Sequence, residues 1–74
     1  MSTLISYVGR DKAGHTQFGQ ALVGCTEWNN TSQLIRGMFE DGWTTLRARD
    51  LDRGVQAGAI EIEPTSGTRI WWAL

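Results

Sequence analysis

The chain has 74 residues, of which 41% are hydrophobic and 20% are charged, and this size and composition predict a single globular domain over residues 1–74. Seven basic and eight acidic residues give a formal net charge of -1, which disfavours a general nucleic-acid coat or a polybasic membrane anchor, because both need an excess of positive charge. The sequence has neither a run of about 20 apolar residues nor a signal-peptide pattern, so we expect a cytoplasmic protein.

The N-terminal third predicts a β-hairpin. The segment from Leu4 to Val8 is short, β-branched and aromatic, and a second apolar segment runs from Gln17 to Cys25. Between them, residues 11–15 include Gly14, which suits a tight turn. We therefore expect two antiparallel strands joined at this turn.

A helix is expected next, because residues 29–32 (Asn-Asn-Thr-Ser) are all good N-caps. With Asn30 as the cap, Gln33 falls at the third helical position and imitates a capping box. Gly42 stands where a glycine ends a helix. The apolar residues of this segment share one helical face: Leu34, Ile35, Met38 and Phe39.

Residues 43–49 predict a third strand, because Leu46 and Ala48 alternate with polar side chains. The C-terminal segment predicts a hairpin in which Ile60 shares a face with Trp72. A three-residue loop over residues 65–67 would pair them, and a five-residue loop would keep the same faces, whereas loops of two or four residues would not. The expected fold is α+β, a small antiparallel sheet with one packed helix in the order β-β-α-β-β-β.

Candidate catalytic residues are few. His15 lies in the expected turn and Cys25 at a strand end, and no motif orients one toward the other. One histidine and one cysteine are too few for the usual zinc site, and the phosphate-binding glycine motifs are absent. We therefore expect no enzymatic activity and no cofactor.

Two pairs of carboxylates have the spacing to share one side of an extended chain, Asp50 with Asp52 and Glu61 with Glu63. Carboxylate oxygens are ligands that Mg²⁺ and Ca²⁺ prefer. A solvated turn and a polar strand face explain the same pattern more simply, so we expect no metal site.

Tryptophan is unusually abundant, with four residues at positions 28, 43, 71 and 72. Adjacent Trp71 and Trp72 must point to opposite faces of a strand. If Trp72 is in the core, Trp71 lies outside near Arg69, a composition typical of a binding hot spot; alternatively, the helix or the first hairpin covers that second face. We expect a protein-binding surface on the C-terminal hairpin, centred on Trp43, Arg69 and Trp71.

The last strand could also be an open edge that pairs with another chain. Because a chain this short has no disulfide or metal to stabilise it, we expect a homodimer or a complex with another protein.

Residues 66–73 (Ser-Gly-Thr-Arg-Ile-Trp-Trp-Ala) resemble the C-terminal sequence of small uncharacterised accessory proteins from actinobacteria and their phages. The resemblance implies a small accessory protein, such as a phage product in the host cytoplasm, that binds a host or viral protein. It brings no catalytic residues.

A winged-helix-like DNA-binding protein is the alternative. The helix over residues 34–41 would then be followed by a second helix over residues 44–53, with Arg47 and Arg49 facing DNA and the last hairpin as the wing. The two-residue connector and the acidic residues among the arginines argue against it.

Overall fold

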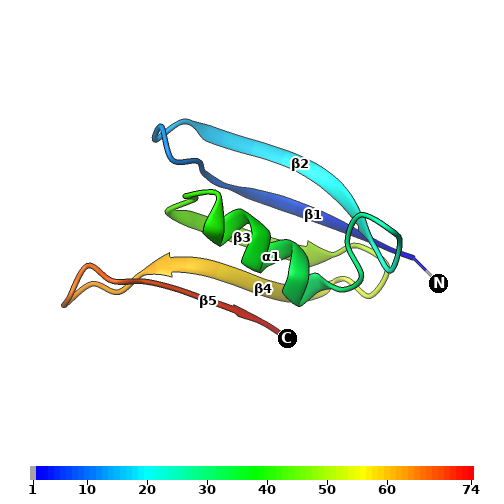
Figure 1. Cartoon of the computed structure of the whole chain (residues 1–74). Coiled ribbons are helices and arrows are strands. Elements are labelled where there is room, and N and C mark those ends of the chain that lie inside the picture. The colour runs from blue at the N-terminus through cyan, green and yellow to red at the C-terminus, as the bar shows by residue number, and fades with distance from the viewer. Residues whose placement is uncertain (1) are drawn as a thin grey trace.

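The computed structural model describes residues 2–74 and consists of a sheet with one helix across it (Figure 1). The strands are β1 (Thr3–Arg10), β2 (Thr16–Val23), β3 (Thr45–Asp50), β4 (Val55–Ile62) and β5 (Arg69–Ala73), and the helix α1 (Thr31–Glu40) lies between β2 and β3 in the chain. All strand pairs are antiparallel, in the order β2-β1-β3-β4-β5. The predicted α+β fold and order β-β-α-β-β-β are confirmed. Within residues 2–74, no helical segment combines the length and the apolar character needed to cross a membrane.

The helix begins and ends where the sequence predicts. The side chain of Asn30 accepts a hydrogen bond of 2.8 Å from the backbone N–H of Gln33, and the Gln33 side chain accepts one of 2.7 Å from the N–H of Asn29. At the other end, Gly42 has φ +100°, a conformation that costs glycine little. These local contacts satisfy backbone groups that a helix end leaves unpaired.

The core lies between α1 and one face of the sheet. Its largest fully buried side chains are Ile5, Ile35, Leu46 and Ile60, from β1, α1, β3 and β4. Burying each contributes about 1.5–3 kcal/mol relative to exposure. The helix approaches β4 so closely that a Cβ on Gly58 would overlap Ile35 Cδ1 and the carbonyl oxygen of Trp72.

The predicted odd-numbered loop of the C-terminal hairpin is wrong. The N–H of Glu63 donates to the carbonyl of Thr68 at 2.7 Å, which leaves a four-residue loop over residues 64–67. The register pairs Ile60 with Trp71 rather than Trp72. Trp71 therefore shares the helix-covered face with Ile60, and Ile70 and Trp72 lie on the opposite face.

Local hydrogen bonds explain this loop. The Glu63 carboxylate accepts from the N–H of Ser66 at 2.5 Å and from its hydroxyl at 2.7 Å, and Gly67, at φ +72°, donates its N–H to the carbonyl of Glu63 at 2.8 Å. An odd-numbered loop would be needed only if the apolar residues of both strands belonged on one face. In the structure both faces carry them.

The second helix of the DNA-binding alternative is absent from the described residues. Residues 45–50 form β3, which pairs with β1 on one side and β4 on the other. Alternation places Leu46, Ala48 and Asp50 together on the buried face of the strand. In a helix, residues spaced two apart would point in different directions around the axis and could not share one buried face.

Candidate binding surface

The three residues predicted to bind a partner are close together, but on the helix-covered face. Trp43 is 8% exposed, and its ring meets Tyr7 edge-on, with 5.9 Å between centroids. Arg69 Nη1 donates hydrogen bonds of 3.0 Å to the carbonyl oxygens of Phe39 and Trp43. Trp71 is half-buried and packs near Phe39, with 6.3 Å between ring centroids. Of the two positions considered for Trp71, the structure therefore shows the one in which the helix covers its face.

This cluster attaches the end of α1 to the sheet. Phe39 is in the last turn of α1, where carbonyl groups lack helical partners and a cation is favourable. Arg69 supplies that cation from β5, and its guanidinium carbon also lies 4.5 Å from the centroid of the Phe39 ring. The Arg69 side chain thus has a stabilising role within the fold.

Among residues 2–74, no helix or strand packs on the face of the sheet away from α1, here called the open face (Figure 1). Strand alternation and register assign the following residues to it: Leu4, Ser6, Val8, Arg10, Thr16, Phe18, Gln20, Leu22, Thr45, Arg47, Arg49, Gln56, Ala59, Glu61, Ile70 and Trp72. Four of its apolar side chains are largely exposed, namely Phe18 (83%), Leu22 (50%), Val8 (47%) and Ile70 (43%).

One row crosses the open face from edge to edge. In register, it consists of Phe18, Val8, Arg47, Ala59 and Trp72. Ala59 is fully buried although no helix covers it, because its larger neighbours in the row, Arg47 and Trp72, flank it. The row therefore presents an arginine between two aromatic ends.

The open face is locally basic in a chain whose net charge is -1. Its strand residues include Arg10, Arg47 and Arg49 but only one acid, Glu61. Arg49 is held by a hydrogen bond of 2.6 Å from Nη2 to the carbonyl of Gly54. Among residues 2–74, the ion pairs present are on other parts of the molecule, Arg36 with Glu40 and Arg53 with Asp50.

A shallow depression of about 790 Å³ lies on this face over β2, β1 and β3. Side chains of Phe18 and Gln20 border it from β2, and those of Arg47 and Arg49 from β3. Apolar and cationic groups therefore surround the same hollow. Phe18 was not among the predicted binding residues. A signal for its face was present in the sequence, because Phe18, Gln20 and Leu22 alternate with the small residues Gly19 and Ala21.

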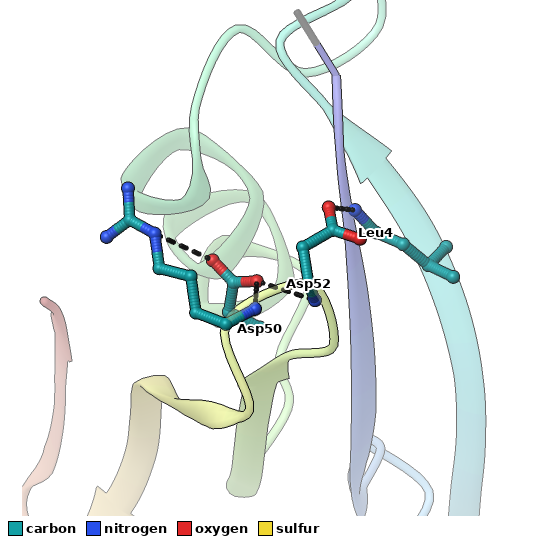
Figure 2. Close-up of polar contacts among 4 residues, drawn as sticks. Leu4, Asp50 and Asp52 are labelled. Atoms are coloured by element: carbon teal, nitrogen blue, oxygen red, sulfur yellow. Dashed lines mark hydrogen bonds and ion pairs between the residues drawn. The ribbon is translucent and has the colours of Figure 1, made fainter.

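The first carboxylate pair serves the β3–β4 turn (Figure 2). Asp50 is 8% exposed, and its Oδ1 accepts from the N–H groups of Asp52 and Arg53, both at 2.9 Å. Asp52 Oδ2 accepts from the N–H of Leu4 at 3.2 Å, which joins the turn to the start of β1. These oxygens already bind backbone donors of the fold.

The second carboxylate pair is divided. Glu61 is exposed on the open face, whereas hydrogen bonds from the Ser66 hydroxyl, and then from the backbone of Ser66 and Thr65, lower the pKa of Glu63 from 4.5 to about 2. No cluster of three or more His, Cys, Asp or Glu residues with the placement of a metal site occurs within residues 2–74.

His15 and Cys25 do not form a pair. His15 is exposed in the β1–β2 turn, where its N–H donates to Asp11 Oδ1 at 3.0 Å. Cys25 follows the far end of β2, and its thiol donates to the carbonyl of Leu22 at 3.4 Å. At a rise of about 3.3 Å per residue, the intervening strand separates the two side chains by more than roughly 20 Å.

Comparisons of this chain with protein-family models, curated proteins and solved structures found no match.

Proposed function

We propose that this protein is a non-enzymatic binding module that contacts a partner protein through the open face of its sheet. The observation that carries the proposal is the exposure of Phe18, whose side chain is 83% accessible on a regular strand. Exposed Val8 lies opposite Phe18 on β1, and exposed apolar side chains that cluster in this way mark interaction surfaces. Aromatic and arginine side chains together are typical of binding hot spots.

The charges of the open face indicate the chemistry of the partner. Arg47 and Arg49 border the hollow next to Phe18, and arginine forms bidentate hydrogen bonds with carboxylates. A partner that places an apolar side chain in the hollow and acidic side chains around it would complement both features. The proposed partner surface is therefore apolar at its centre and acidic at its rim.

The C-terminal hairpin contributes to the proposed binding surface through residues other than those predicted from the sequence. Ile70 and Trp72 face the partner side, whereas Arg69 and Trp71 pack toward α1. Trp43, Arg69 and Trp71 would act on binding indirectly, by holding the sheet in shape.

A photo-cross-linking residue at Phe18, in cells that naturally contain the protein, tests the proposal. We expect an adduct with a second, different protein, identified by its mass. The same residue at Ser32, exposed on α1, should give no such adduct. Arg47→Glu should abolish the Phe18 adduct, and Arg36→Glu on the exposed side of α1 should preserve it.

Equal cross-linking of Phe18 and Ser32 to a different protein, or an adduct of Phe18 with a different protein that is indifferent to Arg47→Glu, would contradict the proposal. A Phe18 adduct of only twice the chain mass would show self-association in place of a different partner.

Single-stranded nucleic acid is the second candidate, favoured by an exposed aromatic ring beside two arginines. Bases stack on such rings when a positive groove holds the backbone. A fluorescent oligothymidine should then bind with strong salt dependence, and Arg47→Ala/Arg49→Ala should abolish that binding. No change in fluorescence anisotropy at low salt would exclude this ligand.

A further inference from the structure

The two edges of the sheet differ in how well they are protected from pairing with another strand. The outer strands are β2 and β5. β5 has five residues and begins with charged Arg69, whereas β2 has eight residues, no charge, no proline and an uninterrupted register with β1. Charges, prolines, bulges and shortness are the usual devices that prevent edge pairing. β2 has none of them.

The hydrogen-bond pattern shows which backbone groups of β2 point outward. The N–H of Asp11 donates to the carbonyl of His15 at 3.1 Å, so, by antiparallel alternation, the odd-numbered residues of β2 bond to β1. The even-numbered residues of β1 face β3 instead, as shown by Arg10, whose carbonyl accepts from the N–H of Thr44 at 3.0 Å. The even-numbered residues of β2 therefore face the free edge, namely Thr16, Phe18, Gln20 and Leu22.

We propose that β2 pairs antiparallel with β2 of a second copy of this chain, forming a ten-stranded sheet across a two-fold axis. Only even-numbered residues offer backbone groups on this edge, so each must lie opposite an even-numbered residue of the second copy. Opposed residues share a face, and the two open faces therefore join into one surface. Both helices lie on the other side.

Side-chain complementarity favours the axis at Gln20. This register places Phe18 opposite Leu22 of the second copy, and Leu22 opposite Phe18 of the second copy. These are the two most exposed apolar side chains of β2, and aromatic with aliphatic pairs across strands stabilise a sheet. On the helix side the same register brings Gly19 opposite Ala21 of the second copy, which avoids crowding.

A second copy fits this edge better than other occupants for two reasons. Residues 13–26 carry no charged side chain, so two identical edges meet without like-charge repulsion. Pairing of β2 with β2 also ends at a dimer, because both copies use the same edge and no further β2 edge remains free. Pairing of β2 with β5 would leave a free edge on each copy and continue into an open fibre. A chain this small, with neither a disulfide nor a metal, gains stability from such burial.

The test uses the purified protein and therefore stands apart from the partner proposed above. Gln20→Pro removes an N–H that the isolated chain does not use, and proline is tolerated on an edge strand when its missing N–H faces outward. Sedimentation velocity should show a dimer for the wild type and for the control Gln20→Ala, and a monomer for Gln20→Pro with an unchanged far-UV circular dichroism spectrum.

Gln20→Lys is the second variant, because it places two like charges together at the axis and leaves the backbone intact. We expect it to weaken dimerisation at least tenfold, and it decides the question if Gln20→Pro does not fold. A wild type that stays monomeric across the micromolar range would overturn the proposal, as would a Gln20→Lys protein that dimerises as tightly as Gln20→Ala.

Discussion

Two neighbouring rows of the sheet, one on each face, differ in the size of their side chains. Both rows cross the same five strands, one under α1 and one on the open face. The helix-side row is Gly19, Tyr7, Ala48, Gly58 and Ala73, and the open-face row is Phe18, Val8, Arg47, Ala59 and Trp72. Apart from Tyr7, the helix-side row holds only glycine and alanine, and at Gly58 a Cβ would meet Ile35 of α1. The open-face row carries large side chains at every position except Ala59.

The difference follows from close packing. A helix can bury its apolar face only if the sheet beneath it leaves room, and interiors are packed without large voids. Here Ile35 of α1 fills the space above Gly58. Large apolar side chains on the open face have no such cover, which is why they are available for binding.

The largest effect is expected in the core. Ile35→Ala removes most of a fully buried side chain and should lower the free energy of unfolding by about 3–4 kcal/mol. Ile70→Ala, on the open face, should lower it by less than about 1 kcal/mol. Urea denaturation of both variants measures the contrast, and equal losses would mean that the open face is also buried.

Trp71→Ala should destabilise the fold by about 2–3 kcal/mol, because the half-buried ring packs against Phe39 and the core. Phe18→Ala removes a ring that is mostly in water and should change the free energy of unfolding of the monomer by about 0.5 kcal/mol or less. Thermal melts on dilute protein compare the two. A neutral Trp71→Ala would assign that ring to the binding surface after all.

Gly58→Ala should cost about 2 kcal/mol, because the new methyl group crowds Ile35 and the carbonyl of Trp72. Ile35→Val removes one of the crowded atoms. The double variant should therefore lose less stability than the sum of the single variants. Strict additivity in a double-mutant cycle would show that helix approach does not restrict this position.

The smallest effect concerns the loop that sets the face of Trp71. Hydrogen bonds from the Ser66 hydroxyl and from the backbone of Ser66 and Thr65 lower the pKa of Glu63 to about 2 in the folded chain, against 4.5 for an unrestrained glutamate. The unfolded chain therefore binds the proton more readily, so the stabilisation is complete above pH 4.5 and is lost as the pH falls toward 2.

An NMR titration of the Glu63 side chain measures this pKa directly. Ser66→Ala should raise it toward 4.5 and loosen the loop at acidic pH. A normal pKa in the wild type would contradict the hydrogen bonds that favour a four-residue loop.

Most of the fold was predictable because its signals are local. The cap at Asn30, the glycine at position 42 and the alternation of Leu46 with Ala48 each act within a few residues, and each predicted element was confirmed. The loop of the last hairpin was not predicted correctly. A change of one residue in the length of this loop moves every side chain of β5 to the opposite face of the sheet.

The candidate binding surface was the least predictable part. Trp43, Arg69 and Trp71 were grouped correctly in space, but their exposure depended on which face α1 covers. Phe18 was overlooked because an aromatic residue in a strand is as typical of a core as of a surface.

The sequence by itself determined the element types, the single helix with its caps and the α+β class, because capping and hydrophobic periodicity depend on neighbouring residues. Only the tertiary structure decided the strand order, the face that α1 covers and the uncovered positions of Phe18, Arg47 and Trp72. Those outcomes depend on contacts between residues far apart in the chain, for which residue size and loop parity matter as much as polarity.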